Sequence, residues 1–203
     1  MSKKISRRDF IKTTAAAGGA AALMPQTIFS SQNKKNLRIG FIGTGLRGQW
    51  MLWLATKYPD VEIPAICDID DGMIGAALKI IKDSGREEPK VYKKNDEDFR
   101  NLVKNEDLDG VYIATPWEWH HPMAIAAMKA GIHVGTEVPA ALTVNECWDL
   151  VNVSEKTEKF CMIMENVCYR RDVMAVLNMV RRDMFGELLH CQGGYQHDLR
   201  HVK

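Results

Sequence analysis

The chain has 203 residues, of which 46% are hydrophobic and 26% are charged, and it contains 15 glycines and 7 prolines. This composition is that of an ordinary globular protein and excludes a disordered or collagen-like chain. The formal net charge of +1 is the sum of two opposite contributions, because residues 1–35 carry +6 and the remainder carries −5. A mildly acidic body without a basic stripe argues against nucleic acid as the main partner, since phosphate binding needs clustered Lys and Arg.

The basic N-terminal segment has the pattern of an export signal. Residues 6–12 read Ser-Arg-Arg-Asp-Phe-Ile-Lys, and a weakly apolar stretch rich in Ala and Gly follows from Thr13 to Met24. Paired arginines before such a stretch are typical of a twin-arginine signal. The stretch has about a dozen residues, fewer than the roughly 20 that span a bilayer, so we expect no stable membrane span. We predict that residues 1–35 are a signal and short linker, and that the protein is periplasmic or secreted. The alternative is a disordered basic tail beside an Ala-rich helix.

The cysteines give no sign of a cross-linked or metal-bound framework. They are odd in number, scattered and mostly placed in apolar runs, where Cys usually acts as a small buried hydrophobe. We predict neither a disulfide framework nor a zinc site from Cys67, Cys147, Cys161, Cys168 and Cys191.

After residue 36 the chain alternates short apolar runs with helical patterns, which predicts an α/β fold with a parallel sheet covered by helices. Strands are expected at residues 37–42, 61–67, 110–114, 133–136 and 160–164. Helices are expected at residues 48–57, 72–84, 96–104, 122–130 and 144–159. A further helix at residues 172–183 leads to a last strand at residues 187–197. We predict a doubly wound Rossmann domain over residues 36–166, and the beginning of a second α/β domain over residues 167–203.

The first strand runs directly into a glycine turn that opens a helix. The turn reads Gly43-Thr44-Gly45-Leu46-Arg47-Gly48, which is the dinucleotide-binding pattern G-x-G-x-x-G. Its glycines are expected to allow the tight turn, the approach of a pyrophosphate, and close packing of helix and strand, while the helix N-terminus supplies N–H groups. The second strand ends at Asp68, where a carboxylate accepts bonds from ribose hydroxyls and repels a 2′-phosphate, which favours NAD over NADP. The alternative is ordinary turn glycines and a surface Asp.

The loop after the strand at residues 110–114 reads Thr-Pro-Trp-Glu-Trp-His-His and is rich in large and titratable side chains. Ligands of doubly wound folds bind beyond the carboxyl ends of the strands, so we predict that this loop contacts the nicotinamide half of the cofactor. The alternative is that the two Trp only cover the edge of the core. His120 and His121 are adjacent and lack the spacing of metal ligands, so no metal is expected there.

The last predicted strand places Tyr195 and His197 on one face, because side chains alternate along a strand. A phenol beside an imidazole can divide proton-transfer work. A half-buried aromatic strand with a surface His is an equally good interpretation of the spacing. His197 and His201 have H-x-x-x-H spacing, but a strand end does not suit a metal site.

Together these motifs resemble the superfamily of glucose-fructose oxidoreductase, inositol dehydrogenase and related proteins (Gfo/Idh/MocA), and more closely glycoside hydrolase family 109. The resemblance runs from about Leu37 to the end of the chain. Its most specific parts are residues 115–120 (TPWEWH), 137–143 (EVPAALT), 146–148 (ECW), 164–166 (MEN), 185–188 (FGEL) and 195–200 (YQHDLR).

The resemblance implies NAD contacts and catalytic residues at matching positions. The NAD contacts are expected at Leu46, Arg47, Asp68, Trp117, Glu118, Trp119, His120, Glu137, Val138 and Asn166. Tyr195 is expected to touch the sugar and to belong, with His197, to the catalytic region. The broader superfamily usually has Glu-Lys-Pro where this chain has Glu-Val-Pro at residues 137–139. Val cannot assist hydride transfer by moving a proton, which weakens the interpretation as a simple dehydrogenase.

The function that the resemblance implies is NAD-dependent hydrolysis of glycans with terminal α-linked N-acetylgalactosamine or a similar sugar. The sugar 3-hydroxyl is oxidised, the acidified C2 proton is removed, the aglycone leaves, water adds at C1 and the hydride returns. This differs from the usual pair of carboxylates of glycosidases. One alternative is a periplasmic NAD-dependent sugar or polyol oxidoreductase. Another is a nucleotide-binding module without catalysis.

The second domain expected from the resemblance is too short for a complete substrate pocket, because its sheet is predicted to start near residue 187 of 203. We therefore expect the chain to be a truncated reading frame, inactive by itself, with some 200 further codons downstream. An exposed sheet edge favours association, so a homo-oligomer is a further expectation.

Overall fold

The computed structural model describes residues 36–194 together with Gln196, Asp198 and Arg200. The strands are β1 (Leu37–Ile42), β2 (Val61–Glu62), β3 (Ala65–Cys67), β4 (Lys90–Tyr92), β5 (Gly110–Ile113), β6 (His133–Thr136) and β7 (Cys161–Ile163). The helices are α2 (Leu46–Ala55), α3 (Asp71–Asp83), α4 (Phe99–Asn105), α5 (Trp117–Lys129), α6 (Val144–Thr157), the short 3-10 helix η2 (Val167–Tyr169) and α7 (Arg171–Arg181).

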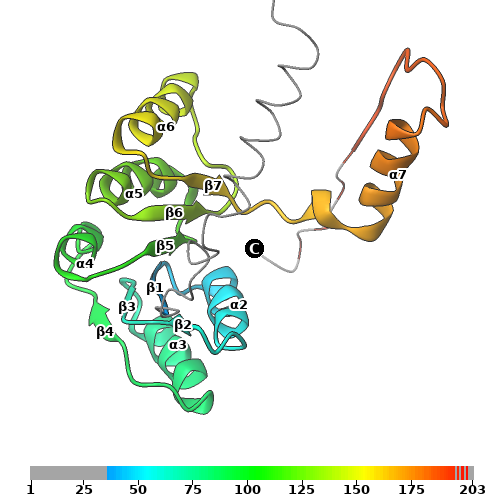
Figure 1. The fold of residues 1–203 in the computed structure, drawn as a ribbon. Helices are drawn as coiled ribbons and strands as arrows, with labels where there is room; N and C mark the ends of the chain where they lie inside the picture. Colours follow the sequence, from blue (N-terminus) through cyan, green and yellow to red (C-terminus); the bar gives the residue numbers. More distant parts are fainter. Residues whose placement is uncertain (1–35, 195, 197, 199, 201–203) are drawn as a thin grey trace, which may run out of the picture.

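The strands form one parallel sheet in the order β4-β3-β1-β5-β6-β7, and β2 pairs with the first half of β1 (Figure 1). Because β2 and β3 lie on the same side of β1, they count as one interrupted strand. When the strands are renumbered in chain order with β2 and β3 counted as strand 2, their order across the sheet is 3-2-1-4-5-6, which is that of a Rossmann fold. The predicted α/β doubly wound sheet is confirmed.

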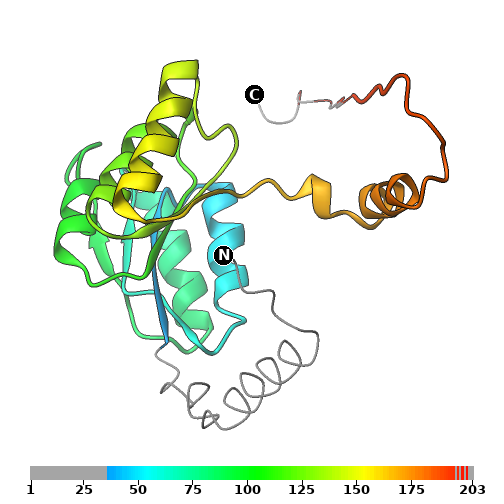
Figure 2. The ribbon, with the colours of Figure 1, turned by 45° about the horizontal axis from the view of Figure 1, so that its top comes forward.

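The core lies on both faces of this sheet, because side chains of a buried strand alternate between two covered faces. Ile42 and Ile113 pack on the face covered by α4, α5 and α6. Their neighbours Phe41 and Tyr112 pack on the opposite face, against α2 and α3. Both views show these two groups of helices on opposite sides of the sheet (Figures 1 and 2).

The strand expected at residues 61–67 is interrupted, and one strand was not predicted. Pro64 has no N–H to donate, and the chain leaves the ladder at Ile63 and Pro64 before rejoining β1 through Ile66. The missed strand is β4, which pairs with β3 although its three residues begin with an exposed Lys90. A short edge strand of this kind has too few residues for a visible alternation pattern.

Helix α5 begins five residues before the predicted start, so the expected loop at residues 117–121 is helical. The prediction placed Pro122 at the helix start, where proline is common. In the structure Pro116 is the N-cap residue and Pro122 lies inside the helix. A proline at this position removes one backbone hydrogen bond, and the remaining bonds of the helix tolerate that loss. Trp117 and its three successors therefore lie on the first turn of α5.

The described residues between 187 and 194 do not form the predicted last strand. A strand needs a partner for its backbone groups, and no described segment pairs with these residues. Tyr195 and His197 lie outside the described residues. The preceding helix α7 has no buried residue and packs mainly against η2, apart from the sheet (Figures 1 and 2).

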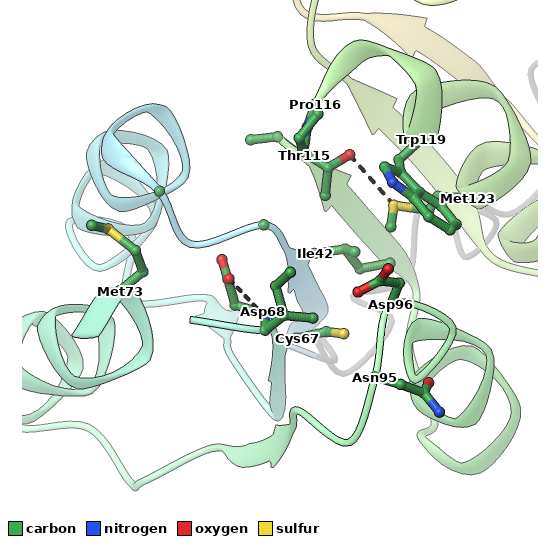
Figure 3. Close-up of a pocket in the computed structure, with 14 residues that line it drawn as sticks. Ile42, Cys67, Asp68, Met73, Asn95, Asp96, Thr115, Pro116, Trp119 and Met123 are labelled. Carbon is green, nitrogen blue, oxygen red and sulfur yellow. Dashed lines mark hydrogen bonds between the residues drawn. The ribbon is translucent and has the colours of Figure 1, made fainter. Parts of the chain in front are cut away.

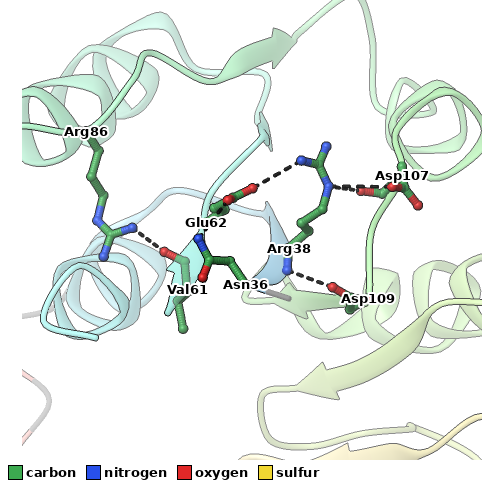
Figure 4. Close-up of polar contacts among 7 residues, drawn as sticks. All are labelled: Asn36, Arg38, Val61, Glu62, Arg86, Asp107 and Asp109. Carbon is green, nitrogen blue, oxygen red and sulfur yellow. Dashed lines mark hydrogen bonds and ion pairs between the residues drawn. The ribbon is translucent and has the colours of Figure 1, made fainter. Parts of the chain in front are cut away.

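A network of polar contacts braces the amino end of the sheet (Figure 4). The backbone N–H of Arg38 donates to Asp109 at 2.9 Å, and its guanidinium donates to Glu62 at 3.1 Å. The guanidinium of Arg86 donates to the carbonyls of Val61 and, at 2.7 Å, Tyr58. These bonds tie β1 to β2 and to the segment before β5 at the end opposite the glycine turn.

Candidate nucleotide-binding site

The glycine turn after β1 has the geometry that its pattern predicts. Gly43 has a φ of +87°, and a Cβ there meets the carbonyl oxygen of Ala114 at 2.5 Å. A Cβ on Gly48 lies 2.1 Å from the carbonyl oxygen of Gly43, so helix α2 can approach the turn this closely only without a side chain. Gly45 has open space where its Cβ points and caps the N-terminus of α2. The turn therefore leaves room and N–H groups for a phosphate.

A cavity of about 310 Å³ lies beside this turn, beyond the carboxyl ends of β1, β3 and β5 (Figure 3). Four of the predicted cofactor residues line it: Gly43, Gly45, Asp68 and Trp119. It is also lined by residues that the sequence analysis did not single out: Met73, Asn95, Asp96 and Met123. Asn95 and Asp96 follow β4. Because that strand was not predicted, these two side chains were not expected at the carboxyl edge of the sheet. This is the edge at which doubly wound folds bind their ligands.

Asp68 accepts hydrogen bonds on both carboxylate oxygens. Oδ2 accepts from the backbone N–H of Thr44 at 2.5 Å and from its hydroxyl at 3.0 Å. Oδ1 accepts from the N–H groups of Ile69 at 2.7 Å and Asp70 at 3.0 Å. These four donors match the roughly four acceptor positions of a carboxylate. Asp68 thus braces the glycine turn, and a ribose hydroxyl has to share or displace one of these bonds.

Cys67 precedes Asp68 and contributes to the lining of the same cavity. Burial raises the pKa of this thiol to about 12, and the nearby carboxylates of Asp98 and Asp68 act in the same direction. The thiol is therefore protonated at neutral pH and is a poor nucleophile.

Arg47, Tyr112 and Glu137 meet beside the glycine turn although they come from α2, β5 and the segment after β6. The Nε of Arg47 donates to Glu137 Oε1 at 2.7 Å, and the hydroxyl of Tyr112 donates to the same oxygen. Glu137 and Tyr112 are buried. Burial and the adjacent Glu137 carboxylate raise the pKa of Tyr112, so its hydroxyl stays a donor. Arg47 and Glu137 were predicted as cofactor contacts, whereas Tyr112 was not.

The four residues Trp117 to His120 occupy three different environments. Trp119 lines the cavity and packs edge-on against Phe99, with ring centroids 6.1 Å apart. Trp117 and Glu118 are exposed. His120 is 1% exposed, and its ring nitrogens lie 2.7 Å from the Pro139 carbonyl oxygen and 2.8 Å from that of Thr115. His120 thereby joins the segments after β5 and β6 rather than lining the cavity.

The predicted cofactor residues that lie outside the cavity lining are Leu46, Arg47, Gly48, Trp117, Glu118, His120, Glu137, Val138 and Asn166. Leu46 is 82% exposed on the first turn of α2, and Val138 is 44% exposed after β6. Asn166 is exposed at the N-cap of η2. Their contacts with a cofactor stay predictions.

Within the described part of the chain, no group of three or more His, Cys, Asp and Glu side chains is arranged to hold a metal ion. Among the same residues, no helix has the length and apolar character needed to cross a membrane.

Three segments of the chain match models of known protein families. Residues 37–165 match the family described as "Oxidoreductase family, NAD-binding Rossmann fold". Residues 169–203 match "Glycosyl hydrolase 109, C-terminal domain". Residues 4–24 match a twin-arginine translocation signal, which confirms the predicted export by this pathway.

Curated relatives match almost the whole chain. It is 51% identical to a glycosyl hydrolase family 109 protein of Parabacteroides distasonis over 98% of its length. It is 50% identical, also over 98% of its length, to a protein of Tannerella forsythia named alpha-N-acetylgalactosaminidase. The chain spans about half the length of these relatives, 46% in each case.

Solved structures share the fold. Myo-inositol 2-dehydrogenase from Lactobacillus plantarum is 25% identical with a TM-score of 0.65, over 75% of this chain and 43% of that one. Scyllo-inositol dehydrogenase from Lactobacillus casei, determined with bound NAD(H) and scyllo-inositol, is 21% identical with a TM-score of 0.66, over 75% of this chain and 43% of that one.

The parallel sheet, the glycine turn and the adjoining cavity define a Rossmann-type nucleotide-binding protein. The chain belongs to the NAD-binding oxidoreductase family of Gfo/Idh/MocA type and, within it, to glycosyl hydrolase family 109.

Proposed function

We propose that this chain is part of an NAD-dependent glycoside hydrolase that removes terminal α-linked N-acetylgalactosamine or a related sugar by transient oxidation, elimination, hydration and re-reduction. The observation that carries the substrate class is the 50% identity, over 98% of the chain, with the Tannerella forsythia protein named alpha-N-acetylgalactosaminidase. Resident NAD supplies a hydride acceptor and then a hydride donor within one cycle, so the reaction has no net redox change.

The residues around the cavity fit this cofactor. The open space at Gly45 and the N-terminus of α2 suit a pyrophosphate. The carboxylate of Asp68 at the end of β3 repels a 2′-phosphate, which favours NAD over NADP. Trp119 and Met123 provide apolar lining for the cavity. These features support NAD as the cofactor.

Proton transfer is assigned to Tyr195, and His197 is proposed to orient that phenol or to contact the sugar. The described cavity supports this choice because two of its three titratable side chains are unsuited. Cys67 keeps its proton, and Asp68 already accepts four hydrogen bonds. Val138, in the Glu-Val-Pro segment, has no group that can carry a proton. Asp96 is the third titratable side chain of the cavity, and the proposal places the acid and base of the elimination on Tyr195 and His197 instead.

The export signal agrees with a cofactor that is recycled in place. Twin-arginine export moves folded proteins, so we propose that NAD is loaded before export. An enzyme that returns its hydride in every cycle needs no further NAD at its destination. A dehydrogenase in the same compartment depends on a continuous supply of oxidised cofactor.

The test uses the protein expressed from its complete reading frame and a p-nitrophenyl α-N-acetylgalactosaminide, without any added electron acceptor. We expect many turnovers per bound NAD and no accumulation of NADH. The Tyr195→Phe variant is expected to bind NAD and to lose turnover, and unchanged turnover removes Tyr195 from the mechanism. Stoichiometric NADH formation indicates the sugar or polyol oxidoreductase instead, while NAD binding without either reaction indicates a nucleotide-binding module.

A further inference from the structure

The carboxylate of Glu137 is the meeting point of three elements that are distant in sequence. Arg47 on the first turn of α2 lies 90 positions away, and Tyr112 on β5 lies 25 positions away. The Glu137 backbone N–H also donates to the carbonyl of Ile113 at 2.9 Å, which fixes its main chain to the end of β5. Both the backbone and the side chain of Glu137 are thus held at the carboxyl edge of the sheet.

The two side-chain donors bond the same oxygen. Arg47 Nε and the Tyr112 hydroxyl both donate to Oε1, and no described residue donates to Oε2. This differs from Asp68, whose two oxygens are both occupied by donors of the chain itself. A carboxylate held through one oxygen has a fixed orientation and keeps acceptor positions on the other. Oε2 of Glu137 can therefore accept a hydrogen bond from a ligand.

Tyr112 is suited to hold this carboxylate for two reasons. Its ring is 5% exposed and packs against Phe41 with centroids 5.6 Å apart, so the hydroxyl has little freedom to move. Burial and the Glu137 charge raise its pKa, so its hydroxyl remains a donor at neutral pH. Arg47, by contrast, has a 39% exposed side chain.

We propose that Tyr112 is a positioning residue for the dinucleotide: its hydroxyl holds Oε1 of Glu137 so that Oε2 accepts from a ribose hydroxyl of the cofactor. The proposal rests on the proposed function only in taking NAD as the ligand. Neither Tyr112 nor Glu137 lines the described cavity. The proposed contact lies beside the cavity, where Arg47 on the first turn of α2 meets Glu137, and Tyr112 acts through Glu137.

The chain contains a matched control for this arrangement. Tyr92 on β4 is 6% exposed, and its hydroxyl donates to Oε1 of Glu106. Lys90 Nζ donates to that same oxygen at 2.9 Å. The three residues repeat the buried tyrosine, carboxylate and cation, and their bonds involve neither Glu137 nor Arg47. Tyr92→Phe therefore removes an equivalent hydrogen bond without touching the proposed site.

The experiment measures the dissociation constant of NAD and the thermal unfolding midpoint for the wild-type protein, Tyr112→Phe and Tyr92→Phe, after removal of any copurified nucleotide. Hydrogen bonds to charged groups contribute about 1.5–3 kcal/mol, so we expect the NAD dissociation constant of Tyr112→Phe to rise about tenfold or more. Tyr92→Phe is expected to keep the wild-type constant while losing a similar amount of thermal stability. Equal constants for wild type and Tyr112→Phe, or equal weakening in both variants, overturn the proposal.

A double-mutant cycle tests whether Tyr112 acts through Glu137. In a Glu137→Ala background, the additional change Tyr112→Phe is expected to leave NAD affinity unaltered, because the carboxylate that it positions is gone. A full tenfold loss in that background contradicts the positioning role. Wild-type protein that binds no NAD overturns the proposal together with the assigned cofactor. Protein that binds NAD but does not hydrolyse the glycoside contradicts only the proposed function, since the binding comparison still decides the role of Tyr112.

Discussion

At the scale of single residues, the glycine turn and the helix that follows it leave no room for a side chain at Gly48. Gly48 lies on α2 where a Cβ meets the Gly43 carbonyl oxygen at 2.1 Å, and that oxygen belongs to backbone that cannot rotate away. Gly75 lies on α3 with no atom within 4 Å of the Cβ position. The two helical glycines therefore differ in their tolerance of a methyl group.

We expect Gly48→Ala to lower the free energy of unfolding by about 2 kcal/mol, because the added methyl group forces helix and turn apart. The same displacement is expected to weaken NAD binding. Gly75→Ala is expected to raise the free energy of unfolding by about 1 kcal/mol, since Ala is the better helix former and meets no clash. Urea unfolding of both variants measures the difference, and a stabilised Gly48→Ala protein contradicts the described turn.

At the scale of elements, helix α6 begins with a complete capping box, which the sequence analysis did not identify. The Thr143 hydroxyl accepts from the Glu146 N–H at 3.2 Å, and the Glu146 carboxylate accepts from the N–H groups of Thr143 at 3.0 Å and Leu142 at 2.7 Å. These bonds satisfy N–H groups that the first turn of a helix leaves unpaired. The pKa of Glu146 is lowered mainly by the hydrogen bond from the Leu142 N–H, and the bond from the Thr143 N–H acts in the same direction.

This lowered pKa predicts a contribution to acid sensitivity. A carboxylate whose folded-state pKa lies below its ordinary value of 4.5 stabilises the protein above that pH. The stabilisation is lost as the pH falls through the lower folded-state value. We expect the unfolding free energy of wild-type protein to decline more steeply below about pH 4.5 than that of Glu146→Gln, which has no charge to lose. Parallel declines in pH-dependent urea unfolding contradict this role for Glu146.

At the scale of the whole molecule, the sheet and its helices form the core, whereas α7 contributes nothing to it. No residue of α7 is buried, and Val173, Val176 and Leu177 are among its exposed apolar side chains. Met164, which follows β7, is the last residue packed against the described core clusters. We therefore expect the residues that stabilise the nucleotide-binding domain to end close to its predicted boundary at residue 166.

We expect a protein of residues 36–166 to fold and to bind NAD with the affinity of a protein of residues 36–203. Its free energy of unfolding is expected to agree within about 1 kcal/mol, because the removed segment buries little apolar surface. Urea unfolding and NAD titration of the two proteins check this expectation. A large loss of stability on removal of residues 167–203 means that this segment contributes to the core.

The sequence by itself determined the features that depend on neighbouring residues. The glycine turn, the export motif and most strand and helix positions follow from local spacing, and the parallel sheet follows from their alternation. Local spacing failed at Pro122, where a proline inside a helix was interpreted as its start, and at β4, which is too short to show a period.

Only the tertiary structure decided how the site is assembled. Nothing around Tyr112 in the sequence distinguishes it from an ordinary residue of a buried strand. It meets Arg47 and Glu137 because parallel pairing gathers the carboxyl ends of β1, β5 and β6 at one edge of the sheet. Hydrogen bonds between residues 25 and 90 positions apart have no local pattern, so they become visible only when the strands lie side by side.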